Sequence, residues 1–125
     1  MILGVGIDII EVARVQASHK RFGERFLNRL LLADEIAYCL SHKNPAPFIA
    51  ARFAAKEAIS KAFGTGTGAQ LGWRDMEIGR KKSGEPFVIL HGNGKKLFKS
   101  RRAKNLLISL SHTTNYAAAA AVLER

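Results

Sequence analysis

Hydrophobic and polar positions alternate along the first residues of the chain. Between residues 3 and 9 every odd position is apolar, whereas the even positions carry two glycines and then Asp8. This period of two predicts a β-strand over 3–9. We expect its apolar face to pack on the core, while the glycine face leaves room for another backbone or a ligand. The apolar stretch is short, lacks a basic leader and runs straight into Glu11, so it indicates a buried strand and neither a signal peptide nor a membrane span.

Beyond this strand the hydrophobic period lengthens to that of a helix. Phe22, Phe26 and Leu30 recur at intervals of four, and an arginine precedes each of them by one position. Gly23 is expected to divide the region into two helices. A short third helix is predicted at 34–40.

A longer helix is predicted from about residue 47 to residue 63. Pro47 suits a first helical turn after the turn sequence "NPAP", and Gly64 closes the helix. The loop "GTGTG" at 64–68 follows, and its spacing fits neither the Walker pattern nor the dinucleotide-binding fingerprint. On its own the loop indicates a helix end with flexible glycines, although its backbone N–H groups could contact phosphate.

The rest of the chain predicts a mostly antiparallel sheet, with "KKSGEP" as a turn and "TTN" as the tip of a closing hairpin. The alanine run after "TTN" also has helix propensity, so a helix remains an alternative there. The expected elements, in order, are strands at 76–78 and 87–90, a basic helical connection at 92–105, and strands at 106–112 and 116–124. Helices interleaved with such a sheet define an α+β class. The 125 residues are expected to fold as a single domain, 1–125.

The composition is that of a folded protein with a strong positive charge. Hydrophobic residues make up 47% of the chain, and 20 Lys and Arg against 10 Asp and Glu give a net charge of +10. Such a surface favours nucleic acid, acidic membrane, phosphorylated small molecules or an acidic protein, and charge alone does not choose among them. Cys39 is the only cysteine, which excludes an intrachain disulfide and a cysteine-based zinc site. It fits the reducing cytoplasm, where we expect the protein to reside.

Asp8 and Glu57 are the carboxylates best suited to act together, but each has a plain structural alternative. Asp8 and Glu11 have the spacing of a helix capping box, and Glu57 could pair with Lys61 one helical turn further on. Spacing alone favours these structural roles, whereas the apolar neighbours of Glu57 count against a solvated pair. If the two carboxylates converge, they form an oxygen-donor site of the kind that binds magnesium together with substrate phosphates, which Lys61 could also reach.

His112 ends an apolar strand, where a lone histidine is more often a hydrogen-bonded core or turn residue than a ligand. No second histidine or cysteine is spaced for zinc, and no nucleophile-elbow sequence supports a hydrolase. The residue alone therefore predicts no chemistry.

Three segments of the sequence resemble the signature blocks of one family. They are "GVGIDIIEVARV", "RFAAKEAISKAFGTG" and "SLSHTTNYAAAAAVLE", in order from Gly4 to Glu124. The turn "SGEP" between the second and third blocks fits the family's Gly-x-Pro turn. On these blocks the chain resembles the holo-[acyl-carrier-protein] synthases, the small members of the 4'-phosphopantetheinyl transferase superfamily, whose fold it is expected to share.

The resemblance implies a reaction and a site. The family transfers the 4'-phosphopantetheine arm of coenzyme A to a serine of apo-acyl carrier protein, in lipid (fatty acid) biosynthesis. Magnesium is the cation and adenosine 3',5'-bisphosphate the second product. By position Asp8 and Glu57 resemble the metal ligands, while a further acidic ligand of larger relatives finds no clear match. Glu57 and Lys61 are the expected catalytic residues, with Glu57 accepting the serine proton directly or through a metal-bound water. Contacts with coenzyme A are implied at Arg52, Lys61, Gly64, Gly84, Pro86 and His112.

The resemblance also implies partners. Acyl carrier proteins are acidic and helical, which gives the basic row Arg14, Arg21 and Arg25 a docking role. The family forms homotrimers with active sites between subunits. A basic nucleic-acid-binding protein is the main alternative, but it leaves Asp8 and Glu57 without a role, and no RNA-module signature is present. The same carboxylates argue against a module that only docks acidic proteins. We therefore expect neither nucleic acid nor a membrane as a partner.

Overall fold

The computed structural model describes all 125 residues, and its elements follow the predicted order. Along the chain they are β1 (Ile2–Glu11), α1 (Val12–Phe22), α2 (Glu24–Leu30), α3 (Ala33–Leu40), α4 (Ala46–Phe63), a 3-10 turn (Trp73–Asp75), β2 (Met76–Arg80), β3 (Pro86–Leu90), α5 (Gly92–Ser100), β4 (Asn105–His112) and β5 (Tyr116–Glu124). This mixture of helices and antiparallel strands confirms the α+β class. None of the helices has the length and apolar character needed to cross a bilayer.

Three antiparallel strands form the larger sheet, in the order β1-β5-β4. The predicted hairpin joins β4 to β5, and at its tip the Thr113 N–H donates to the Tyr116 carbonyl at 2.8 Å. The alanine run of β5 is a strand and not a helix, because β5 is paired on both edges and its alternate residues Ala117, Ala119 and Ala121 are buried. Strands β2 and β3 form a separate antiparallel hairpin.

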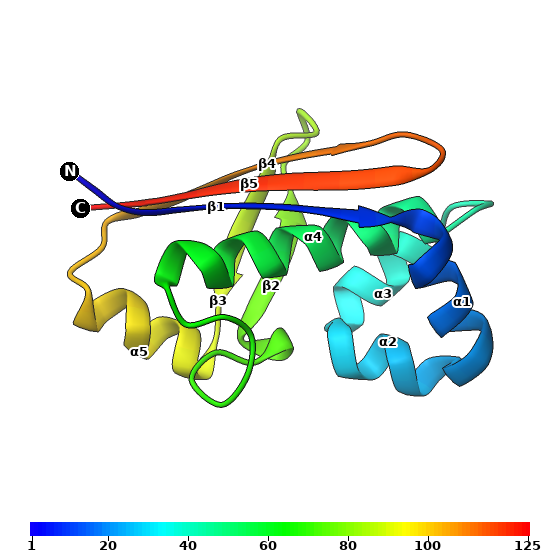
Figure 1. Ribbon diagram of the computed structural model, residues 1–125, viewed down its shortest axis with the longest axis horizontal. Helices are drawn as coiled ribbons and strands as arrows, with labels where there is room; N and C mark the ends of the chain where they lie inside the picture. The colour runs from blue at the N-terminus through cyan, green and yellow to red at the C-terminus, as the bar shows by residue number, and fades with distance from the viewer.

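Helix α4 runs along the inner face of this sheet (Figure 1), and glycines of β1 allow the close approach. A Cβ atom on Gly4 would lie 1.9 Å from the carbonyl oxygen of Ala62. A Cβ atom on Gly6 would lie 1.8 Å from the carbonyl oxygen of Ala58. The glycine face of β1 therefore meets the helix backbone directly, as the sequence suggested for another backbone or a ligand.

The opposite face of β1 is exposed. Val5, Ile7 and Ile9 are 65%, 71% and 67% exposed, so the prediction that this apolar face packs on the core is wrong for these three residues. Only Leu3, at the start of the strand, packs against the core cluster. The backbone of α4 comes so close that only the glycine face fits against it, which leaves the larger side chains outside. Val5, Val122 and Leu107 are register partners across the three strands, so an apolar row crosses the outer side of the sheet.

The core consists of two apolar clusters, one along each half of α4. Phe63, Leu71 and Met76 belong to the cluster between the second half of α4, the strands and α5. Leu27 and Leu30 belong to the cluster between the first half of α4 and helices α1–α3. Helices α1–α3 therefore occupy one end of the molecule, and α5 lies at the other end, where both chain termini are found (Figure 1).

One ion pair lies inside this core. Lys56 Nζ donates to Glu35 Oε1 at 2.8 Å and to the Leu30 carbonyl oxygen at 2.7 Å, while Glu35 Oε2 accepts from the Ile78 N–H at 3.0 Å. Burial lowers the pKa of Lys56, and the charge of Glu35 partly opposes that shift. The pair joins α3, α4 and β2, and no sequence pattern predicted it.

Candidate active site

Lys61 connects helix α4 to strand β1 at the candidate site. Its Nζ donates to Asp8 Oδ1 at 3.2 Å and to the Ile7 carbonyl oxygen at 2.9 Å. The Asp8 side chain is 17% exposed and the Lys61 side chain is 51% exposed, so the pair is open to solvent on one side. Together with Ile9 and Ala118 these residues line a shallow hollow of about 310 Å³.

The structure excludes both structural alternatives for these side chains. Asp8 lies within β1, and the N-cap residue of α1 is Glu11, which makes no side-chain capping hydrogen bond. Lys61 pairs with Asp8 and not with Glu57. The capping-box and i, i+4 interpretations are therefore wrong for this chain.

Glu57 lies one helical turn before Lys61 on α4. Its Oε1 accepts a hydrogen bond from the Thr67 hydroxyl at 3.2 Å, and the Ser60 hydroxyl donates to its backbone carbonyl at 2.7 Å. No hydrogen bond joins Glu57 to Asp8, which contacts Lys61 instead. Sequence reasoning missed Thr67, although the alternating glycines and threonines directly after the helix were an available signal.

The type of metal that could bind here depends on the number of possible ligands, which is two carboxylates, Asp8 and Glu57. No group of three His, Cys, Asp or Glu side chains is placed to hold an ion. Zinc-type sites need three or four such ligands. Magnesium is commonly held by one or two carboxylates, with water and substrate phosphates completing its shell. Two carboxylates are a donor set of the magnesium type and not of the zinc type, and a magnesium site shared by Asp8 and Glu57 stays a prediction.

The loop after α4 folds back on the end of the helix. Gly64 has a left-handed φ of 79°, and its N–H donates to the Lys61 carbonyl at 3.0 Å. The N–H groups of Thr65 and Gly66 both donate to the Ser60 carbonyl. The prediction that Gly64 closes the helix is therefore confirmed. Its contact with coenzyme A stays a prediction.

Arg52 is buried on α4, away from the hollow beside Asp8. The residue is 1% exposed, and its guanidinium lies over the Tyr38 ring at 4.3 Å from the ring centroid. Its Nη1 donates to the Phe48 carbonyl at 3.4 Å, while its Nε is buried with no hydrogen-bond partner. Arg80 lies over the same tyrosine ring at 5.6 Å. A role for Arg52 in binding coenzyme A stays a prediction.

Gly84, Pro86 and His112 lie elsewhere on the chain. Gly84 has a φ of 92° in the turn between β2 and β3, and Pro86 begins β3. His112 ends β4, and its exposed ring packs edge-on against Phe48 at 5.0 Å between ring centroids. No hydrogen bond or ion pair links these residues to Lys61 within the chain. The coenzyme contacts implied for them stay predictions.

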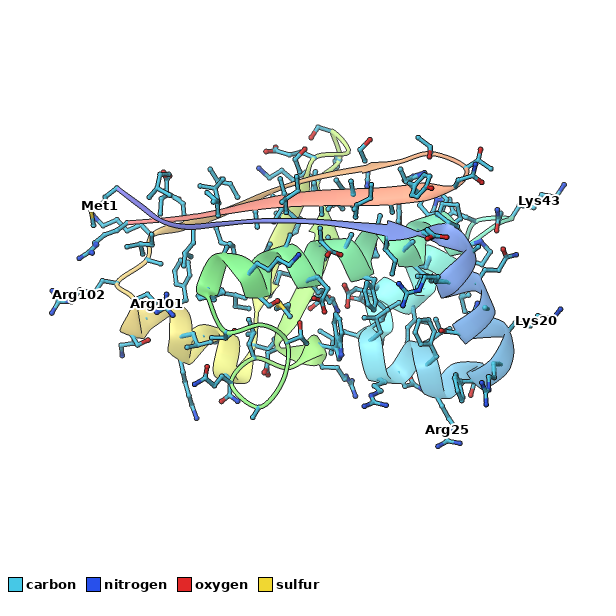
Figure 2. The ribbon with its side chains drawn as sticks, viewed as in Figure 1. Met1, Lys20, Arg25, Lys43, Arg101 and Arg102 are labelled. Atoms are coloured by element: carbon cyan, nitrogen blue, oxygen red, sulfur yellow. The ribbon has the colours of Figure 1, made fainter.

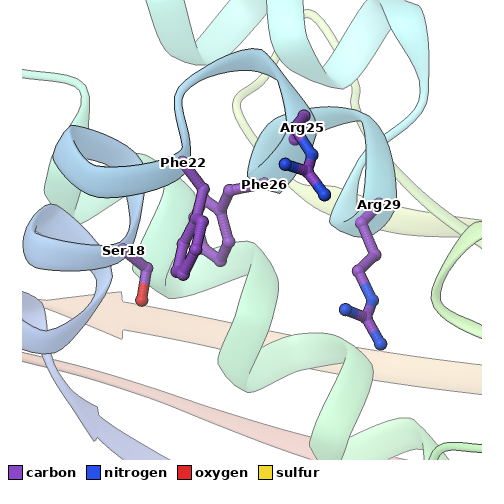
Figure 3. Close-up of a pocket in the computed structure, with 5 residues that line it drawn as sticks. All are labelled: Ser18, Phe22, Arg25, Phe26 and Arg29. Carbon is purple, nitrogen blue, oxygen red and sulfur yellow. The ribbon is translucent and has the colours of Figure 1, made fainter.

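The basic row on α1 and α2 is exposed and borders a hollow of mixed polar and aromatic lining. Arg14, Arg21 and Arg25 are all exposed, and none of them forms an ion pair. A hollow of about 280 Å³ lies beside the row and is lined by Ser18, Phe22, Arg25, Phe26 and Arg29. In Figure 3 the guanidinium groups of Arg25 and Arg29 lie apart from the rings of Phe22 and Phe26. This end of the molecule combines unpaired cations with apolar surface.

Comparison with known proteins identifies relatives of this chain. A family model described as the 4'-phosphopantetheinyl transferase superfamily matches residues 4–121. A holo-[acyl-carrier-protein] synthase of Koribacter versatilis is 46% identical over 124 residues, which covers 99% of each protein. The fold is similar to that of holo-[acyl-carrier-protein] synthase from Neisseria meningitidis, with a TM-score of 0.93, 31% identity and full coverage of both chains. The Helicobacter pylori holo-[acyl-carrier-protein] synthase, solved in complex with coenzyme A, matches with a TM-score of 0.86 and 35% identity over 96% of this chain and 99% of that one.

Proposed function

The chain belongs to the holo-[acyl-carrier-protein] synthases of the 4'-phosphopantetheinyl transferase superfamily, and we propose that Asp8, Glu57 and Lys61 carry out their reaction with magnesium. The enzyme moves the 4'-phosphopantetheine group of coenzyme A to a serine of apo-acyl carrier protein. The serine oxygen forms a bond to the phosphorus that carries the pantetheine arm. The bond from that phosphorus to the bridging oxygen breaks, and adenosine 3',5'-bisphosphate leaves with the bonding electrons.

The contact between Lys61 and Asp8, one helical turn from Glu57, is the observation that carries this proposal. Asp8 and Glu57 would hold magnesium, which would neutralise charge on the pyrophosphate. Lys61 lies beside the hollow and places a cation where the departing bisphosphate gains charge. Glu57 accepts the serine proton, and its hydrogen bond from Thr67 orients the carboxylate for that role.

Docking of the carrier protein is assigned to the exposed row Arg14, Arg21 and Arg25. An acidic helix brought to this row would meet unpaired cations, and the hollow lined in part by Phe22 and Phe26 could take an apolar side chain. Charged groups at the rim guide association, whereas an apolar anchor in a pocket supplies affinity. This end of the molecule offers both.

A homotrimer with sites between subunits is the proposed assembly. The outer face of the sheet exposes the apolar side chains of Val5, Ile7, Ile9 and Leu107. A small protein rarely leaves such an apolar surface uncovered. Ile7 and Ile9 also line the hollow beside Asp8, so a second subunit packed on this face would help to close the site. Gly84, Pro86 and His112 would then reach coenzyme A from a neighbouring subunit.

The setting proposed for this reaction is the cytoplasm, where the enzyme would supply holo-carrier protein to fatty acid synthesis. The lone Cys39 supports that location, since it forms no disulfide and is buried as a free thiol. Coenzyme A and the apo-carrier protein are the substrates, and no nucleic acid is required.

The decisive experiment mixes the protein with apo-acyl carrier protein, coenzyme A and magnesium, and then weighs the carrier. We expect a mass gain of one phosphopantetheine arm, which is lost when magnesium is chelated or when the acceptor serine of the carrier is replaced by alanine. Asp8→Asn and Glu57→Gln should abolish the gain without unfolding the protein, because neither side chain caps a helix. A carrier that never gains mass, whichever carrier protein is supplied, would refute the proposal.

A further inference from the structure

Arg101 follows helix α5 and reaches the end of helix α4. Its Nη2 donates a hydrogen bond to the carbonyl oxygen of Phe63, the last residue of α4. The two residues are 38 positions apart in the sequence. Arg101 is half-buried and Phe63 is fully buried. The basic stretch 92–105, to which Arg101 belongs, has no role in the function described so far.

The bond supplies a partner that the end of α4 would otherwise lack. A helix leaves its last four carbonyl groups without partners inside the helix. The carbonyls of Ser60 and Lys61 accept from N–H groups of the following loop, and the carbonyl of Ala62 faces strand β1. The carbonyl of Phe63 is left for Arg101. A cation at a helix C-terminus also interacts favourably with the helix dipole.

The packing of helix α5 determines the position of Arg101. Leu97 and Phe98 pack against the apolar cluster that contains Phe63. The backbone N–H of Arg101 donates to the Leu97 carbonyl at 3.0 Å and so continues the last turn of α5. The side chain of Arg101 therefore joins a packed helix to the point where α4 turns into the loop 64–68.

We propose that Arg101 is a positioning residue for the transfer reaction, because it holds the end of α4 and the start of the loop in place for coenzyme A. This inference rests on the function proposed for Lys61 and the loop. Phe63 lies two residues after Lys61 and four residues before Thr67, which hydrogen-bonds Glu57. Movement of the Phe63 carbonyl would therefore displace the phosphate-binding cation on one side and the partner of the proton acceptor on the other.

The test compares Arg101→Gln with Arg102→Gln, which removes the same charge one residue further on. Arg102 is exposed and projects from the outer end of the molecule, whereas Arg101 lies closer to α5 (Figure 2). In Arg101→Gln we expect hydrogen exchange of amides 64–68 to rise roughly tenfold and the KM for coenzyme A to rise about fivefold, the scale of one lost charged contact at a helix end. The KM for the carrier protein should not change.

Arg102→Gln should match the wild type in every measurement. Arg101→Lys should show smaller increases in exchange and in the KM for coenzyme A than Arg101→Gln, because it keeps a cation at this position.

Several outcomes would overturn the inference. Equal changes in Arg101→Gln and Arg102→Gln would point to net charge alone. If the Tm of Arg101→Gln falls while amide exchange and the KM for coenzyme A stay unchanged, Arg101 only stabilises the helix end and does not position the site. If Arg101→Gln does not fold, Arg101→Lys and Arg102→Lys, which both keep the charge, make the matched comparison. If the wild type fails to bind coenzyme A, the proposed function fails and the catalytic part of this inference fails with it. The exchange measurement still decides whether Arg101 holds the loop.

Discussion

At Lys61 one ammonium group contacts both the carboxylate of Asp8 and the backbone carbonyl of Ile7. Two acceptors on β1 therefore set its position, while about half of the side chain remains accessible to a ligand. Charge on the bisphosphate grows as the phosphorus–oxygen bond breaks. A cation held at this place would therefore stabilise the transition state more than the bound coenzyme.

Lys61→Ala should lower turnover by on the order of a hundredfold and weaken coenzyme A binding by a much smaller factor, as expected for a group that acts mainly in the transition state. The measurements are kcat with saturating carrier protein and the coenzyme A dissociation constant by calorimetry. Lys96→Ala removes an exposed lysine from α5 and serves as the matched control. Unchanged turnover in Lys61→Ala would show that Lys61 only forms an ion pair with Asp8 and takes no part in the reaction.

At the scale of the elements, alternation and helical period predicted nearly every strand and helix. The alternation within β1 was visible in the sequence, but not which of its faces would be covered. The rule that apolar faces turn inward fails here, because the glycine face admits the helix backbone while the apolar face stays outside. The Asp8–Lys61 contact joins positions 53 apart, and the Glu35–Lys56 contact joins positions 21 apart. No local pattern predicts such contacts, because they depend on how α4 packs.

The close packing of β1 on α4 gives a sharp test with Gly6→Ala. The added Cβ would lie 1.8 Å from the Ala58 carbonyl oxygen, so strand and helix must separate. We expect a loss of stability of about 1–3 kcal/mol, typical of overpacking, and a loss of transfer as Asp8 moves away from Lys61. Urea unfolding and the carrier mass assay measure the two effects.

Gly68→Ala is the control for that variant. A Cβ atom on Gly68 meets nothing within 4 Å, and the residue does not have a positive φ. It should fold with nearly wild-type stability. If Gly6→Ala were equally well tolerated, the distance between α4 and β1 would have to be larger than in this structure.

At the scale of the whole molecule, positive charge is divided between two ends. Lys20 and Arg25 lie at the end formed by α1 and α2, and Arg101 and Arg102 lie at the opposite end (Figure 2). A hollow at the α5 end is lined mostly by apolar side chains and by Lys104, whereas the hollow at the first end has two phenylalanines and two exposed arginines in its lining. We therefore assign carrier docking to the end formed by α1 and α2. Positive charge alone does not distinguish this end from the other.

Arg25→Glu should raise the KM for the carrier protein about tenfold and leave coenzyme A affinity unchanged, since the charge faces only the carrier. Raising the salt concentration should mimic the variant, because exposed charges are screened over roughly 10 Å at 0.1 M salt. Lys96→Glu, which reverses an exposed charge on α5, should have little effect. A carrier KM that is independent of salt would remove the electrostatic docking model.

The outer face of the sheet tests the proposed assembly. Val5 is 65% exposed in the single chain and lies in the apolar row with Val122 and Leu107, so Val5→Glu places a charge on this face without disturbing the interior. A charge buried without a partner in a subunit interface is costly, and we expect the variant to sediment as a monomer where the wild type sediments as a trimer. Transfer should be lost with the trimer, because each site would lack the residues of its neighbour. Ile89→Glu, at a 39% exposed position in the smaller sheet, is the control and should keep both assembly and activity. A wild-type protein that sediments as a fully active monomer would show that one chain completes the site, and the exposed apolar row would then need another partner.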